Sequence, residues 1–106
     1  MRRLSPLVLV FLLTGVTPGL AKPAHCSTSD DGEYACDFTL TDTDGSFRIT
    51  AHGKPAIMLN MTAPGRADGY AELGGRNVAL PGEYVRSAAD PACWVNTDTR
   101  DRVCAR

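Results

Sequence analysis

Four cysteines, at positions 26, 36, 93 and 104, are the residues of this chain whose type and spacing most directly predict chemistry. Nine residues separate the first two and ten separate the last two, whereas zinc sites built from thiolates use much closer pairs. In a short exported chain, an even number of cysteines forms disulfides instead. We therefore predict two disulfides among Cys26, Cys36, Cys93 and Cys104, each worth roughly 2–4 kcal/mol.

The pairing of these cysteines is open at this stage, because four cysteines allow three pairings. Hairpin geometry favours the local pairs 26–36 and 93–104, since directly opposed cysteines can be bridged where two strands bring their Cα atoms closest. The alternative is 36–104 with 26–93, which would tie the first strand to the last.

Soft side chains that could bind copper are His52, Met58 and Met61, with His25 near the start of the exported part. Met58 and Met61 stand three apart in a stretch that alternates like a strand, so they face opposite sides of it. Methionines in such a stretch usually fill the core. The sequence therefore predicts no metal site and no cofactor, and a periplasmic metal-binding protein is the weaker alternative.

Catalytic residues in a working arrangement are not evident in the sequence. A serine or cysteine nucleophile needs a base, and the two histidines, His25 and His52, stand near the expected cleavage site and in a Gly-Lys-Pro turn. No G-x-S-x-G motif is present, and the carboxylates lie in turns of a domain too small for a deep cleft. We therefore predict that the protein is not an enzyme.

The first 21 residues have the layout of a secretory signal peptide. Arg2 and Arg3 precede the apolar run 7–13, and the small residue Ala21 precedes the expected cut. The apolar run is too short to cross a membrane. Cys26 lacks the preceding small residue of a lipid-modified cysteine. We predict a periplasmic or secreted protein with no membrane anchor after cleavage.

The charge of the exported part argues against one class of partner. Without the two signal-peptide arginines, nine basic residues face twelve acidic ones, so the formal net charge is about −3. No basic stripe with interleaved aromatic residues exists, and we predict no nucleic-acid binding. An acidic exported domain attracts a basic partner instead. The acids that crowd its first part are Asp30, Asp31, Glu33, Asp37, Asp42 and Asp44.

The elements that must position these residues are strands, because apolar residues after residue 21 recur at every second position rather than at helical spacing. The clearest hairpin has the turn sequence Asp44-Gly45. A two-residue turn there would place Leu40 opposite Ile49 and Phe38 opposite Ala51, with their side chains on one face.

Two more hairpins follow from the same pattern. A turn at Gly74-Gly75 sets Ala71 opposite Val78, and a turn centred on Asp98-Thr99 sets two pairs opposite each other. Those last pairs are Trp94 with Val103 and Cys93 with Cys104, which makes Trp94 a core plug. Between the first two hairpins, residues 55–62 read as a strand and residues 62–69 as a loop. The inward residues of that strand are Ile57, Leu59 and Met61.

Seven or so short strands without a helix predict an all-β fold, a small antiparallel β-barrel (or sandwich) stapled by two disulfides. The barrel is favoured because closure removes exposed strand edges. The predicted organisation is a signal peptide at 1–21, an N-terminal extension at 22–33 and the barrel domain at 34–106.

One family shows a similar order of features. Tyr34-Ala35-Cys36 on the first strand is followed by a strand pair near 70–80, then Gly82-Glu83-Tyr84, Trp94 and the terminal Cys104. In this order the chain resembles the bacterial inhibitors of C-type lysozyme, which are small periplasmic or lipid-anchored antiparallel barrels. The resemblance implies a first-strand to last-strand disulfide, which would be 36–104 here.

The resemblance also implies a function: an exported binding or inhibitor module that protects the cell wall from a host muramidase, with a cationic C-type lysozyme as partner. Family members insert a serine and a Lys-Gly-Asp-Glu-like stretch into the lysozyme cleft. This chain has Leu80-Pro81 and Val95–Asp98 there, and Asn96 could hydrogen-bond in place of the lysine. An envelope interaction domain without catalytic activity is the alternative. The implied partner-binding residues are Gly82, Glu83, Tyr84, Asn96, Thr97 and Asp98.

Overall fold

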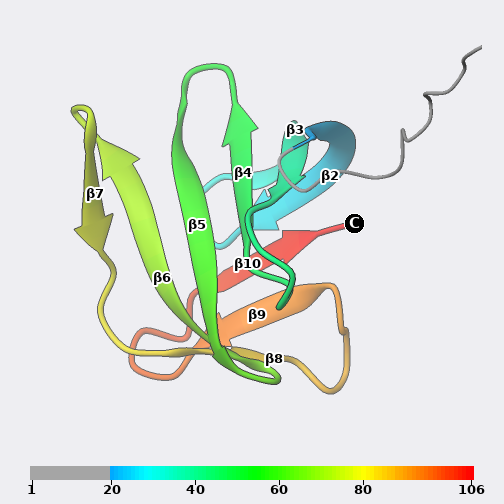
Figure 1. Ribbon diagram of the computed structural model, residues 1–106, viewed down its shortest axis with the longest axis vertical. Coiled ribbons are helices and arrows are strands. Elements are labelled where there is room, and N and C mark those ends of the chain that lie inside the picture. The colour runs from blue at the N-terminus through cyan, green and yellow to red at the C-terminus, as the bar shows by residue number, and fades with distance from the viewer. Residues whose placement is uncertain (1–19) are drawn as a thin grey trace, which may run out of the picture.

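The computed structural model describes residues 20–106, which form nine β-strands (Figure 1). The predicted signal peptide lies outside the described residues except at its last two positions. Within residues 20–106, no helix long and apolar enough to cross a membrane is found. The strands are β2 (Lys22–Thr28), β3 (Gly32–Leu40), β4 (Phe47–Ala51), β5 (Lys54–Ala63), β6 (Arg66–Leu73), β7 (Arg76–Ala79), β8 (Tyr84–Arg86), β9 (Cys93–Asn96) and β10 (Arg102–Ala105).

Eight of these strands close into an antiparallel barrel, as the alternating sequence predicts. The ring runs β5-β4-β3-β2-β10-β9-β8-β6 and returns to β5. Strand β6 makes this possible because its first residues pair with β8 and its last residues pair with β7. Strand β7 therefore lies outside the ring beside β6, at the left edge of Figure 1.

The barrel begins earlier than at residue 34. Residues 22–28, expected as an extension, form strand β2, which pairs with β3 on one side and with β10 on the other. Strand β2 thereby joins the N-terminal half of the sheet to the last strand of the chain. The N-terminal segment is an integral part of the ring.

The first predicted hairpin forms, but its predicted register is wrong. Leu40 lies opposite Phe47 and Phe38 lies opposite Ile49, a shift of two residues that keeps the same side chains on the same face. The physical reason is Asp42, whose Oδ1 accepts hydrogen bonds from the amides of Asp44 at 2.8 Å and Ser46 at 3.1 Å. This side chain stabilises a wider loop than a two-residue Asp-Gly turn.

Residues 62–69, predicted as a loop, form strand instead. Strand β5 continues to Ala63 and β6 starts at Arg66, so the connection is a tight turn at Pro64-Gly65. Composition misled here because small and polar residues can occupy a strand that pairs on both sides. The turn at Gly74-Gly75 is confirmed, with Ala71 directly opposite Val78.

The core is the barrel interior. Leu59, Ile49 and Phe47 are almost fully buried there, and only 2% of the surface of Trp94 is exposed. Trp94 lies directly opposite Val103, which confirms it as the predicted core plug. At one end of the barrel the Arg86 guanidinium covers the Trp94 ring, 4.7 Å from its centroid, which is close enough for a cation–π interaction.

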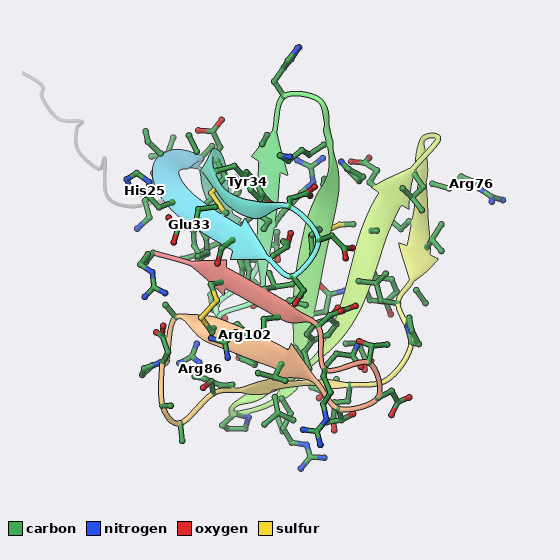
Figure 2. The ribbon with its side chains drawn as sticks, turned by 180° about the vertical axis from the view of Figure 1, so that it is seen from behind. His25, Glu33, Tyr34, Arg76, Arg86 and Arg102 are labelled. Carbon is green, nitrogen blue, oxygen red and sulfur yellow. A yellow bond between two sulfur atoms is a disulfide. The ribbon has the colours of Figure 1, made fainter. Side chains whose placement is uncertain are left out.

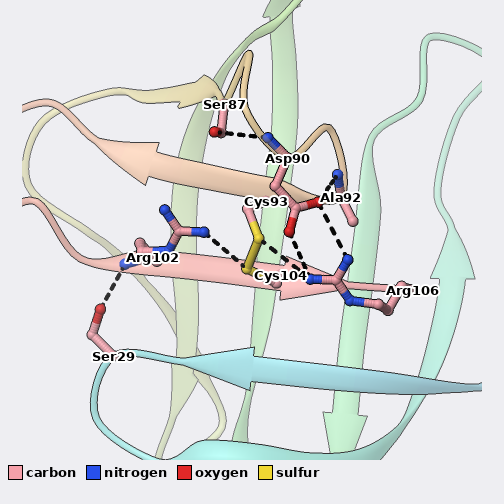
Figure 3. Close-up of a disulfide and its surroundings, with 8 residues drawn as sticks. All are labelled: Ser29, Ser87, Asp90, Ala92, Cys93, Arg102, Cys104 and Arg106. Atoms are coloured by element: carbon pink, nitrogen blue, oxygen red, sulfur yellow. Dashed lines mark hydrogen bonds and ion pairs between the residues drawn. A yellow bond between two sulfur atoms is a disulfide. The ribbon is translucent and has the colours of Figure 1, made fainter.

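Two disulfides, Cys26–Cys36 and Cys93–Cys104, stabilise the ring, and the local pairing is the correct one. Cys93 and Cys104 lie directly opposite each other with Cα atoms 4.0 Å apart, on the outer face of β9 and β10 (Figure 3). The 36–104 bond implied by the family resemblance is wrong. Cys36 points into the core from β3, and β2 separates β3 from β10.

Candidate functional site

The six predicted partner-binding residues come together at one end of the barrel. Antiparallel pairing brings to this end, here called the pocket end, the turns at residues 29–31, 52–53, 74–75 and 97–101 and the segment that enters β8. Tyr84 on β8 lies opposite Asn96 on β9. The Thr97 amide donates to the Glu83 carbonyl at 2.8 Å, so the two predicted segments are hydrogen-bonded neighbours.

Asn96 does not have the role predicted for it. Its side chain is 1% exposed and is fully engaged inside the protein. The Nδ2 donates to the Pro81 carbonyl at 2.6 Å, and the Oδ1 accepts from the amides of Asp98 at 2.8 Å and Thr99 at 3.0 Å. Asn96 is therefore an internal brace, and it cannot hydrogen-bond to a partner in place of a lysine.

Gly82 is packed directly against this brace. Its φ is +70°, a conformation that residues with a Cβ rarely adopt. A Cβ at this position would lie 2.6 Å from the Asn96 Oδ1 and 2.9 Å from the Asp98 Cγ. A glycine is needed here because the β7–β8 connection passes so close to the β9–β10 turn.

Tyr84 and Glu83 are also held by the protein itself. Tyr84 is 4% exposed, and its ring packs on the backbone of Gly69, where a Cβ would come within 2.9 Å of the ring Cδ1. Glu83 accepts two hydrogen bonds from the Arg66 guanidinium, at 2.7 and 3.0 Å. These hydrogen bonds and the positive charge of Arg66 lower the pKa of the Glu83 carboxyl below its ordinary range.

Three of the six residues remain available for contact. Gly82, Thr97 and Asp98 are exposed, whereas Glu83 is half-buried and the other two are buried. The exposed part is a short ridge, here called the 82/98 ridge, in which two chain segments brace each other. Because both segments are hydrogen-bonded to each other, the ridge is ordered in the protein alone, and an ordered surface loses less entropy on binding than a flexible one.

A pocket that sequence reasoning missed opens beside this ridge. It has a volume of about 210 Å³ and is called here the barrel-end pocket. Its walls come from β2, β3, β5, β6, β8 and β10, so residues far apart in the sequence contribute to it. The lining residues are Thr28, Ser29, Asp30, Asp31, Tyr34, Lys54, Pro55, Ile57, Ala71, Leu80, Tyr84, Asp101, Arg102 and Val103.

The two tyrosines of the pocket sit in an acidic environment. Burial, and then the charge of Asp31, raises the pKa of the Tyr34 hydroxyl above its ordinary value. Burial also raises the pKa of Tyr84, with smaller contributions in the same direction from Asp101 and Asp30. Both phenols therefore stay neutral at physiological pH, and the three carboxylates lie on the neighbouring turns 29–31 and 97–101.

The side chains of the weaker, copper-binding alternative are not brought together. His52 lies in the β4–β5 turn, and Met61 lies near the far end of β5, roughly 23 Å further along at about 3.3 Å per residue. Met58 pairs with outward-facing Arg48, whereas Met61 packs against the core. Among residues 20–106, no cluster of three or more His, Cys, Asp or Glu side chains could hold a metal ion.

Comparison of the chain with models of known protein families, with curated proteins and with solved structures finds no match.

Proposed function

We propose that the protein is an exported binding module that inhibits a cationic C-type lysozyme, and that it docks through the 82/98 ridge. The observation that carries the proposal is the bracing of this ridge. Thr97 donates to the Glu83 carbonyl at 2.8 Å, and Asn96 donates to the Pro81 carbonyl at 2.6 Å. Two segments fixed to each other form a preorganised surface, which loses less entropy when it docks into an enzyme cleft.

Charge supports a basic partner. The exposed turn 97–101 carries Asp98 and Asp101 against one base, Arg100, and Asp30 and Asp31 stand in the neighbouring turn. Acidic groups grouped at one end attract a cationic protein and orient its approach, which mainly raises the association rate. The formal charge of about −3 for the exported part acts in the same direction.

Two disulfides in a barrel of this size support export, because they form and persist in oxidising compartments. The periplasm and the extracellular space are the compartments in which a lysozyme inhibitor would meet its target.

The test is a lysis assay. The full chain is expressed through a secretory route, and the purified product is mixed with a C-type lysozyme and bacterial cell walls. We expect lysis to fall as the molar ratio of protein to enzyme rises. Lysis that is undiminished at high molar excess would reject the proposal.

Two charge-matched variants localise the contact. Asp98→Lys on the ridge should weaken inhibition at least ten-fold, because it places a like charge against a cationic partner. Asp44→Lys changes the net charge equally but lies at the opposite end of the barrel, so it should inhibit like the parent protein. Equal loss in both variants would show that only net charge matters and would reject the ridge as the contact.

A second candidate is an envelope interaction domain with a different protein partner. It is favoured by the burial of Asn96 and Tyr84, which removes two of the side chains that the lysozyme-inhibitor resemblance offered for contact. A pull-down from envelope extract, with Asp98→Lys as the control, distinguishes the two: a partner that is not a muramidase and is lost in the variant supports this candidate.

A further inference from the structure

We propose that the barrel-end pocket binds an alkylammonium group, which is a short apolar stem that ends in a positively charged amine. This site is separate from the 82/98 ridge in its chemistry, and the proposal does not depend on lysozyme inhibition.

The pocket exists because one strand presents only small residues to the interior. The inward positions of β6 are Ala67, Gly69 and Ala71. The ring of Tyr84 packs on Gly69 and fills that level of the barrel. One level higher, Ala71 lies opposite Ile57, and both line open space. The pocket is thus the unfilled end of the barrel interior.

The volume and walls of the pocket suit a short stem. At about 210 Å³ it is smaller than the roughly 300–1,000 Å³ of sites for drug-sized ligands. Ile57, Leu80 and Val103 supply aliphatic surface, and Tyr34 and Tyr84 supply aromatic surface. Aliphatic walls favour burial of a hydrocarbon stem, and aromatic faces attract an ammonium ion.

The charge of the pocket selects a cation. Asp30 and Asp101 both line it, and neither makes an ion pair with any residue in the described range 20–106. These carboxylates lie on two neighbouring turns, because β2 pairs with β10 and the Arg102 amide donates to the Ser29 Oγ at 2.8 Å. An ammonium group between them would gain from both charges.

The two basic residues that line the pocket do not cancel these acids. The Lys54 Nζ lies 3.6 Å from the Asp31 Oδ1, so its charge is already matched. The Arg102 guanidinium points to the outer face of β10, where its Nη2 lies 4.0 Å from the Cys104 Sγ (Figure 3). In Figure 2, Tyr34 and Arg102 lie on opposite sides of β2.

Lys54 itself shows how the pocket accommodates an alkylammonium. Its Nζ lies over the ring of Tyr34, 4.9 Å from the centroid, and beside a carboxylate. The same pocket offers a second aromatic ring, Tyr84, and two further acids, Asp30 and Asp101, and Lys54 is the only lysine among its lining residues. We infer that an external amine takes this second position.

The test is a titration followed by NMR. The full chain is expressed through a secretory route, and n-butylammonium is added to the purified protein at constant ionic strength. We expect saturable shifts of the Tyr34 and Tyr84 ring signals and of the Ile57 and Leu80 methyl signals. Butanol, which has the stem without the charge, and ammonium chloride, which has the charge without the stem, should not saturate in the same range. No saturable shift with the amine would overturn the proposal.

Variants separate a specific site from general attraction to an acidic protein. Asp30→Asn combined with Asp101→Asn should weaken amine binding at least ten-fold. Asp44→Asn combined with Asp68→Asn makes the same change in net charge at exposed positions outside the pocket, and it should bind like the parent. Equal affinity in the two double variants would overturn the site. Ala71→Leu, which fills the region of the pocket meant for the stem, should also abolish binding. If Ala71→Leu does not fold, the comparison of the two double aspartate variants still decides the test, because all four aspartates are exposed.

Two further probes identify the source of the amine. 1,5-Diaminopentane represents a free diamine, and a capped Gly-Lys-Gly peptide represents a lysine side chain presented by a protein. Tighter binding of the diamine assigns the pocket to free amines, and tighter binding of the peptide assigns it to a protein side chain. Failure of both probes to compete with n-butylammonium would overturn the assignment to this pocket.

Discussion

The side chain of Asn96 donates a hydrogen bond to the carbonyl of Pro81 at 2.6 Å, across fifteen residues of sequence. Together with the hydrogen bond from the Thr97 amide to the Glu83 carbonyl, this contact joins the β9–β10 turn to the β7–β8 connection. Because Asn96 is almost completely buried and its Oδ1 also accepts from Asp98 and Thr99, one residue organises both segments of the 82/98 ridge. The shape of the candidate docking surface therefore depends on a residue that a partner does not touch.

Asn96→Ala is expected to lower the free energy of unfolding by about 1–3 kcal/mol, because the Pro81 carbonyl and two turn amides lose their hydrogen-bond partner. Urea denaturation measures this loss. Asn77→Ala, at an exposed position on β7, is the control and should change stability by less than about 0.5 kcal/mol. Equal effects in the two variants would contradict the bracing role.

Gly82→Ala is expected to destabilise the protein more than Gly74→Ala. Both glycines have positive φ, at +70° and +58°, so both substitutions carry similar backbone strain. Only at Gly82 does the added Cβ also collide with Asn96 and Asp98, whereas nothing lies within 4 Å of it at Gly74. Overpacking of this kind costs about 1–3 kcal/mol more, measurable as the difference between the two midpoints of thermal unfolding. Similar midpoints would show that the ridge rearranges to accommodate the added methyl group, and they would contradict the prediction.

Peptide mapping of the non-reduced protein is expected to recover Cys26 linked to Cys36, and Cys93 linked to Cys104. Replacing either pair by alanine should cost about 3 kcal/mol, because the unfolded chain regains the entropy of a loop of ten or eleven residues. The two double variants should lose similar amounts, since the loops are of nearly equal length. A peptide that contains Cys36 linked to Cys104 would contradict the described topology.

The stability that Asp90 contributes is expected to disappear in acid. Its hydrogen bonds with Arg106, at 2.8 and 3.2 Å, and with the Ala92 amide lower its folded pKa below the ordinary value of 3.8. A carboxyl whose pKa is lower in the folded state stabilises the protein above the unfolded pKa, and this contribution is lost as the pH falls through the folded pKa.

Asp90→Asn tests this dependence. The midpoint of thermal unfolding should be lower in the variant than in the parent at about pH 5–7, and the difference should shrink below about pH 4. Comparing the two proteins cancels the titration of Asp42 and Glu83, whose pKa values are also lowered. A difference that stays constant down to about pH 2 would contradict the ion pair as its source.

Local features of the fold were predictable because neighbouring residues encode them. The turn centred on Asp98-Thr99 was correctly placed because the apolar pattern and the turn residues agree, and it favoured the Cys93–Cys104 bond over the alternative pairing, which stayed open until the structure was known. For the Asp44-Gly45 hairpin, the prediction gave the correct inward face of each strand but the wrong register between them. A competing side-chain interaction, from Asp42 to two amides, decided between two loops that the pattern allows equally.

By itself, the sequence of this protein determined the all-β character, the inward residues of most strands and the register of two of the three predicted hairpins, since each depends on residues close together in the chain. Only the tertiary structure decided that β2 joins β10, that Asn96 is buried and that a pocket remains above Ala71. These features arise where side chains from several distant strands either fill or leave a shared volume. No local sequence pattern predicts this volume, because it depends on the side chains of all the strands in the closed ring together.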